Sequence, residues 1–152
     1  MKAISASSQR QANDHAVEQA AHLRKLQRTQ FVQWSVGALG GKWRAGWGRS
    51  RGFQGHLVVW PKQYRALDDA PLEKCRWYPI QVKQKNKVGR PDIDAFQAVM
   101  MREDCDKGFF VGFDFSSDAL REINAFFKRT RKVIIALTVR EILDEEIAMK
   151  MA

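Results

Sequence analysis

The second half of the chain alternates strand-like runs with helix start signals, and this alternation restricts the fold more than any other feature. Four runs rich in β-branched and aromatic residues are expected strands: 53–61, 75–84, 107–115 and 132–137. Helices are expected to begin at Pro91, at Ser116 or Ser117, and at Thr138, which forms a capping box with Glu141. The pattern predicts an α/β fold, a mixed sheet of about four strands flanked by helices.

A helical segment precedes these strands. Residues 11–39 contain good helix formers and have no Gly or Pro before Gly37, and we expect a bend near Arg28–Thr29. We therefore divide the chain into a polar N-terminal helical extension, 1–28, and a domain, 29–152. Apolar residues at helical spacing predict the buried face: Leu26, Phe31, Trp34, Val36 and Leu39.

The positive charge of the chain is concentrated in one segment. The formal net charge of the chain is +9. Residues 1–67 contain 11 Lys and Arg and only two acids, so this segment carries all of the net charge, and residues 68–152 are neutral overall. No carboxylate occurs from Gln19 to Leu67. Such a field favours a polyanion, most simply nucleic acid, and the alternative is a solubilising basic surface.

Several other protein classes are disfavoured. Cys75 and Cys105 are isolated, which argues against a disulfide scaffold or a structural zinc site. The N-terminus lacks the apolar region of a secretory signal, and no run is long enough to span a membrane. No G-x-G-x-x-G or Walker pattern is present. We expect a cytoplasmic protein without membrane contact.

The stretch "QVKQK" that ends the second strand carries the candidate chemistry. Strand side chains alternate, so Gln81, Lys83 and Lys85 share one side of the strand. A plain surface strand has this pattern, and so does half of a metal-dependent nuclease site.

The surrounding residues carry a family resemblance. The segments "IQVKQKNKVGRPDIDAFQAV", "KGFFVGFDFSSDALREI" and "KVIIALTVREIL" resemble the Mrr-type restriction endonuclease domains of the PD-(D/E)XK nuclease superfamily. In that family the second catalytic strand carries Gln-x-Lys, which here is Gln81-Val82-Lys83. The resemblance covers about residues 29–143 and implies a restriction-endonuclease-like fold, DNA as the ligand, and Mg²⁺ as the cofactor of an active member.

The resemblance also implies roles for three residues. Gln81 would ligate the metal or its water shell, and Lys83 would orient the water or stabilise developing charge. Gln54 stands where the family has its catalytic Asp. Two further acidic positions of the family hold Ser50 and Val32 here. A neutral amide does not supply the charge compensation of a carboxylate at Mg²⁺.

Other acids are weaker candidates for a metal site. The nearest upstream acids are Asp68, Asp69 and Glu73, in the connection after Pro61. Asp92 and Asp94 lie at a helix start, where the helix dipole favours acids. His56 lies two residues after Gln54. It is interpreted either as a residue of the site or as a half-buried histidine without a role there.

The glycine-rich segment 40–55 and the strand that follows supply candidate DNA contacts. Cations and aromatic residues suited to phosphate contact and base stacking are Arg44, Arg49, Arg51, Lys85, Lys87, Trp43 and Trp47. The alternative is that both tryptophans fold back onto the core.

Three functions follow as hypotheses. The first is a DNA-interacting protein of Mrr-like fold that cleaves DNA with a divalent metal if it is active, with a homodimer as a further hypothesis. The second is a catalytically degenerate module that binds DNA or a partner protein without cutting. The third is a structural α/β protein whose basic half contacts an acidic protein.

Overall fold

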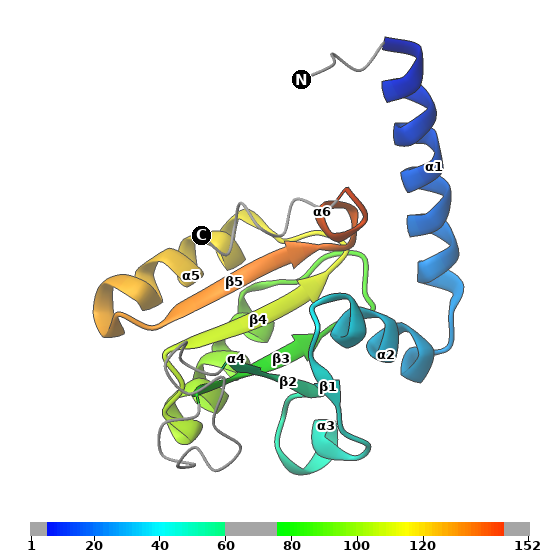
Figure 1. The fold of residues 1–152 in the computed structure, drawn as a ribbon. Helices are drawn as coiled ribbons and strands as arrows, with labels where there is room; N and C mark the ends of the chain where they lie inside the picture. The colour runs from blue at the N-terminus through cyan, green and yellow to red at the C-terminus, as the bar shows by residue number, and fades with distance from the viewer. Residues whose placement is uncertain (1–5, 60–75, 145–152) are drawn as a thin grey trace.

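The protein is a mixed sheet with helices on both faces (Figure 1). The computed structural model describes residues 6–59 and 76–144, and every structural statement below concerns these residues. The strands are β1 (Lys42–Trp43), β2 (Gly55–Val59), β3 (Arg76–Val82), β4 (Lys107–Gly112) and β5 (Val133–Thr138). The helices are α1 (Ala6–Lys25), α2 (Arg28–Ala38), α3 (Trp47–Ser50), α4 (Arg90–Glu103), α5 (Ser117–Thr130) and α6 (Val139–Leu143).

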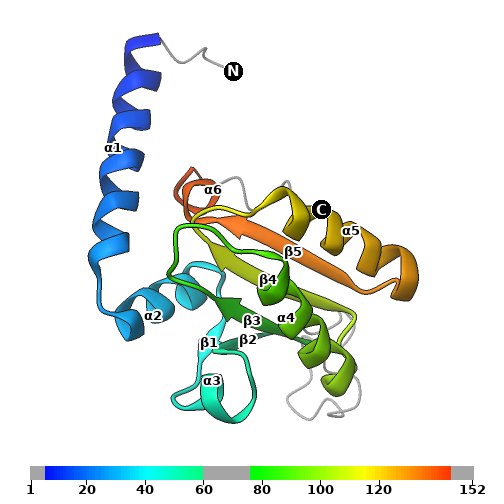
Figure 2. The same cartoon turned by 180° about the vertical axis from the view of Figure 1, so that it is seen from behind.

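The sheet has the spatial order β1-β2-β3-β4-β5. The first three strands pair antiparallel, and β3, β4 and β5 pair parallel. The parallel strands are joined through α4 and α5, which lie together on one face of the sheet (Figure 2). The predicted α/β class and the restriction-endonuclease-like mixed sheet are confirmed.

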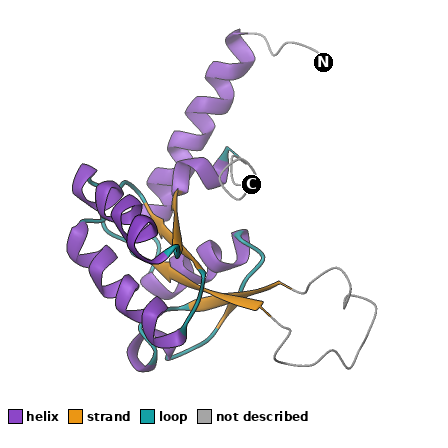
Figure 3. Ribbon diagram, turned by 90° about the vertical axis from the view of Figure 1, so that its left-hand side faces the viewer, coloured by secondary structure: helices purple, strands orange, loops and turns teal. Residues whose placement is uncertain are grey.

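Each face of the sheet has its own apolar core, because successive strand side chains point to opposite sides. Ile80 of β3, Phe109 of β4 and Ile135 of β5 lie in register and belong to the core shared with α2 and α6. Phe110 and Ile134, one residue away, belong to the core shared with α4 and α5. Figure 3 shows helices on both sides of the sheet.

The N-terminal helical segment is interrupted, as expected, but the break lies about two residues before the predicted position, Arg28–Thr29. α1 ends at Lys25 and α2 begins at Arg28. The predicted core face is confirmed: Phe31, Val36 and Leu39 are buried, and Leu26 and Trp34 pack against them. The N-terminal part of α1 projects away from the sheet (Figure 1), which agrees with its polar sequence.

The glycine-rich segment 40–55 contains regular secondary structure. It contains β1 and α3, so the sheet has five strands where about four were expected. A two-residue strand has no side-chain period that a sequence can display, and β1 exists through its pairing with β2. Gly55 permits this packing, because a Cβ there would lie 2.7 Å from Cγ1 of Val36 in α2.

Proline is disfavoured inside a central strand because it cannot donate to the ladder, yet Pro79 lies in β3, a central strand. Pro79 pairs with His56 of β2, whereas pairing with β4 begins one residue later, at Ile80. The missing N–H of proline therefore falls outside the parallel ladder and interrupts no bond to β4.

The helix starts predicted from local signals are confirmed. Pro91 lies in the first turn of α4, and the Ser116 hydroxyl at the start of α5 accepts a hydrogen bond from the Ala119 N–H at 3.1 Å. Thr138 and Glu141 form the capping box of α6. In the part of the chain that the structure describes, no helix combines the length and hydropathy of a membrane span.

Candidate functional site

The candidate site lies where β2 and β3 separate. Their antiparallel pairing ends at Gly55↔Ile80, and the next N–H, that of Gln54, donates to the Ile80 carbonyl at 3.0 Å. The side chain of Gln54 then continues the ladder, because its Oε1 accepts a hydrogen bond from the Val82 N–H at 2.9 Å. Gln54 is 8% exposed. Its carbonyl oxygen is thus engaged in holding β3.

Two adjoining cavities open beside this point. One of about 280 Å³ is lined from α2 and the 43–54 segment by Arg28, Thr29, Val32, Trp43, Arg44, Gly46, Gly48 and Gln54. Another of about 280 Å³ is lined by Arg28, Val82, Lys83, Gln84 and Lys85. Arg28 lines both. We call the region formed by Arg28, Arg44, Gln54, Lys83 and Lys85 the basic notch.

The end of β3 supplies the two lysines of the basic notch. Lys83 follows the last residue of β3, and its N–H donates to the Val111 carbonyl of β4 at 3.0 Å, which fixes the backbone there. Its side chain is half-buried, whereas Lys85 is exposed. Gln81 is 8% exposed, and its Oε1 is buried without a hydrogen-bond partner among the described residues. Among the described residues of β3, it is the one buried side-chain oxygen without a hydrogen-bond partner.

Lys85 is partly neutralised by α4. Its ammonium forms an ion pair with the Asp92 carboxylate, which also accepts a hydrogen bond from the Gly89 N–H at 3.0 Å. Burial by itself would raise the pKa of Asp92, but the hydrogen bonds from Lys85 and Gly89 and the charges of Lys85 and Lys83 outweigh it, so the pKa is lowered. Asp92 therefore serves as a helix-capping acid and remains charged.

The aromatic residues of segment 43–54 pack against the two cores. Trp43 packs on the core shared with α2, and Trp47 on the core shared with α4. The guanidinium of Arg51 lies over the Trp47 ring at 4.4 Å, and that of Arg44 at 5.9 Å. The arrangement matches the alternative in which both tryptophans fold back, while the two arginines remain exposed.

His56 lies beneath the same aromatic group. Its ring stacks on Trp47 with centroids 5.3 Å apart, and its Nδ1 is buried without a hydrogen-bond partner among the described residues. Burial, followed by the charges of Arg44, Lys42 and Arg51, lowers the pKa of His56 below its usual value. The position of His56 agrees with the prediction of a half-buried histidine.

The remaining predicted residues either form ion pairs away from the two cavities or lie outside the described residues. Lys87 is exposed and lies 3.7 Å from the carboxylate of Asp114. Arg49 is in α3, and its side chain is outside the described residues, as are Asp68, Asp69 and Glu73. Asp94 is exposed and forms an ion pair with Arg90 one turn earlier in α4.

The described residues do not fit Mg²⁺. This ion prefers carboxylate oxygens and water, and neither cavity of the basic notch is lined by a described carboxylate. Among the described residues, no group of three or more His, Cys, Asp and Glu side chains converges. Gln81 and Gln54 offer neutral amide oxygens, and that of Gln54 is already bonded.

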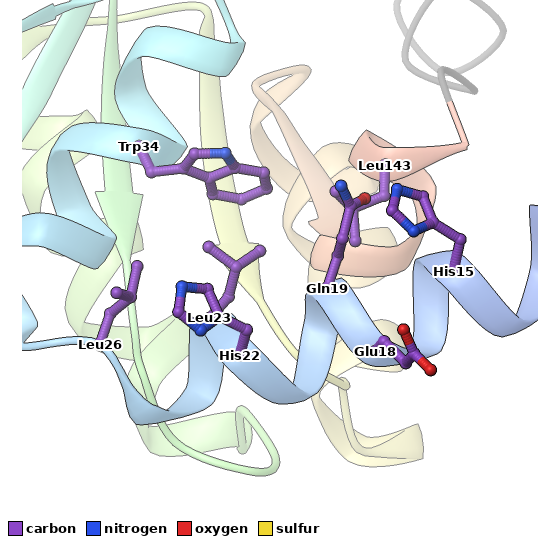
Figure 4. Close-up of a pocket in the computed structure, with 8 residues that line it drawn as sticks. All are labelled: His15, Glu18, Gln19, His22, Leu23, Leu26, Trp34 and Leu143. Carbon is purple, nitrogen blue, oxygen red and sulfur yellow. The ribbon is translucent and has the colours of Figure 1, made fainter.

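The larger groove at the foot of α1 has a different character. It has a volume of about 410 Å³ and is lined by His15, Glu18, Gln19, His22, Leu23, Leu26, Trp34 and Leu143 (Figure 4). Its described lining holds no Lys or Arg. The groove therefore lacks the charge that would attract nucleic acid, and we place the candidate site at the basic notch.

Comparison with known families agrees with the topology. The family model described as restriction endonuclease (Mrr catalytic domain) matches residues 64–144, slightly more than half of the 152-residue chain. The chain belongs to this restriction endonuclease family. No curated protein matches it. The matched range of this Mrr-family domain includes β3, α4, β4, α5, β5 and α6, with Gln81, Lys83 and Lys85.

Val32 and Gln54 lie before the matched range. They are the residues expected from sequence to stand at acidic positions of the family, and both line the same cavity. Arg28, one helical turn before Val32, was not among the residues predicted for the site. Sequence contained a signal for it: Arg28 is a cation in the acid-free segment, on the helix that carries the missing acidic position. Arg28 was missed because the predicted boundary placed it at the end of the N-terminal extension, 1–28, and outside the domain, 29–152.

Proposed function

We propose that this Mrr-family domain is a DNA-binding module that contacts the DNA backbone through the basic notch and does not cut it. The observation that carries the proposal is the state of Gln54. We align Gln54 with the family's catalytic Asp, and its neutral side chain accepts a hydrogen bond at Oε1 from the Val82 N–H. Around it, the charged groups that line the two cavities are cations.

The chemistry of these cations suits backbone phosphates. Lys and Arg that neutralise phosphates release condensed counterions, which gives affinity with little dependence on base sequence. Arg44, Lys83 and Lys85 supply three such charges at the basic notch, and Arg51 lies beside it above Trp47. Arg49 and Lys87 remain predicted DNA contacts, and Trp43 and Trp47 contribute mainly by packing against the protein core.

The first experiment measures binding and cutting together. Purified protein is incubated with supercoiled plasmid in Mg²⁺ or Mn²⁺, and binding to a labelled duplex is followed by fluorescence anisotropy over a salt series. We expect binding without nicking. Lys83→Ala should lower affinity about equally for unrelated sequences and reduce the slope of log K against log salt by about 0.9.

A matched control separates the basic notch from general charge loss. Lys128 lies in the last turn of α5, on the far side of the sheet from α2 (Figure 1). Lys128→Ala removes the same charge and should leave affinity and salt slope near the wild-type values. Equal losses in the two variants, or no loss in either, would contradict the proposed surface.

A metal-dependent endonuclease is the second candidate, and the buried Oε1 of Gln81 favours it, since an unpaired acceptor suits a cation or a water. Plasmid nicking by the wild type that disappears in Lys83→Ala would establish this function in place of the first.

A double-strand break is made most easily by two sites, so we propose a homodimer together with this candidate. Light scattering of the protein on a sizing column measures that state.

A further inference from the structure

Arg28 is shared by the two cavities of the basic notch. Arg28 begins α2, is exposed, and lines both cavities, so it faces Gln54 and Arg44 on one side and Lys83 and Lys85 on the other. Within residues 6–59 and 76–144, no carboxylate forms an ion pair with Arg28. Its charge is therefore available to a ligand.

The position of Arg28 is fixed relative to the lysines. The Nε2 of Gln84, which lies between Lys83 and Lys85, donates hydrogen bonds to the carbonyls of Leu26 at 2.7 Å and Leu23 at 3.2 Å. These carbonyls belong to the end of α1 and the corner before α2. The same side chain thus ties the corner that precedes Arg28 to the segment that carries the two lysines.

Two further contacts hold this corner. The guanidinium of Arg24 donates from Nη1 to the Asn86 Oδ1 at 2.8 Å and lies over the Phe113 ring at 4.5 Å. On the other side of Arg28, Phe31 and Val32 are buried in the core. A side chain between two anchored points loses less freedom on binding a ligand than one on a loose segment, which favours a defined contact.

We propose that Arg28 binds a DNA backbone phosphate between the start of α2 and the end of β3, and supplies there the positive charge that a divalent metal supplies in a metal-dependent nuclease. The guanidinium presents a planar fork of N–H donors that matches two phosphate oxygens, whereas a lysine is a point charge. Binding at the basic notch is therefore independent of metal. This inference rests on the proposed function, since it requires DNA at this site.

The test compares five proteins on one labelled duplex, each in EDTA and in Mg²⁺: wild type, Arg28→Ala, Arg28→Lys, Lys83→Ala and Lys128→Ala. Wild-type affinity in EDTA should equal or exceed that in Mg²⁺, because added Mg²⁺ only competes for phosphates. Arg28→Ala should bind about tenfold more weakly, and its salt slope should fall by about 0.9. Arg28→Lys should recover the slope and only part of the affinity.

The outcomes separate the inference from the function on which it rests. If Arg28→Ala binds like the wild type while Lys83→Ala is weakened, the role of Arg28 is wrong and the DNA-binding function stands. Wild-type binding that requires Mg²⁺ also overturns the role of Arg28. If the wild type binds no DNA in either buffer, both fail. Circular dichroism melting checks that Arg28→Ala, a change at an exposed helix start, keeps the fold.

Discussion

The side-chain Oε1 of Gln54 accepts a hydrogen bond of 2.9 Å from the backbone N–H of Val82, at the point where β2 and β3 separate. In an uninterrupted antiparallel pair, a backbone carbonyl would take this N–H. Here the side-chain amide of Gln54 accepts this hydrogen bond, and only 8% of the Gln54 surface is exposed. The bond makes Gln54 a structural residue of the sheet, and it connects the site to the stability of the fold.

Replacement of Gln54 by alanine should therefore destabilise the domain. The change leaves the Val82 N–H buried without its acceptor, and an unsatisfied buried donor costs about 1–3 kcal/mol. Urea unfolding followed by circular dichroism measures the loss. A change below about 0.5 kcal/mol, which is ordinary for surface substitutions, would mean that water replaces the amide.

The Gln54→Asp variant tests the alignment with the Mrr family. A carboxylate at position 54 adds the negative oxygen ligand that Mg²⁺ prefers. We expect Mg²⁺ to raise the melting temperature of Gln54→Asp and to permit nicking of supercoiled plasmid. Gln54→Asn is the control, because it shortens the side chain equally and stays neutral. If Mg²⁺ acts on neither variant, Gln54 does not occupy the position of the catalytic Asp.

Asp92→Asn should strengthen DNA binding. Asp92 holds the ammonium of Lys85 in an ion pair, so its neutralisation releases a cation to the phosphate surface. We expect about a two- to fivefold gain in affinity at low salt and a smaller gain at high salt, because screening weakens exposed charges.

The matched control for this gain is Asp94→Asn, on the same helix. It removes the same charge, but Asp94 pairs with Arg90 at 3.8 Å and not with a residue of the basic notch. Equal gains in the two variants would indicate a general charge effect and would remove Lys85 from the contact surface. Anisotropy titrations at two salt concentrations distinguish the cases.

The pKa of His56 should report on DNA at the basic notch. Burial and the charges of Arg44, Lys42 and Arg51 lower this pKa, and bound phosphates would offset the three cations. The pKa should therefore rise towards 6.5 when DNA binds. NMR titration of the His56 imidazole protons in the free and the DNA-bound protein measures it, and an unchanged pKa would contradict phosphate contact near Arg44, Lys42 and Arg51.

The same lowered pKa makes stability depend on pH with a definite sign. The unfolded chain binds the His56 proton more readily than the folded one, so stability falls as pH drops below 6.5 towards the folded-state pKa. Above 6.5 this contribution is absent. His56→Gln should flatten that part of the stability curve measured by urea unfolding, and an unchanged slope would show that another group titrates there.

Local sequence determined the regular elements of the second half of the chain. The cap between Ser116 and Ala119 and the capping box of Thr138 and Glu141 span three residues, so their hydrogen bonds need no tertiary contact. The buried positions of α4 (Ile93, Phe96, Val99 and Met100) follow from helical spacing in the same way. The motif Gln81-Val82-Lys83, together with "VGRPDI" and the downstream elements at their spacing, indicated the Mrr family.

Only the tertiary structure decided what surrounds that motif. The bond from Val82 to Gln54 joins residues 28 positions apart, and those from Gln84 to the α1–α2 corner join residues about 60 apart. Periodicity reports which face a side chain occupies but not which distant group it meets, because such pairs depend on the packing of whole elements. For this reason Arg28 was not predicted for the site, and Trp43 and Trp47 were assigned from sequence to DNA as readily as to the core.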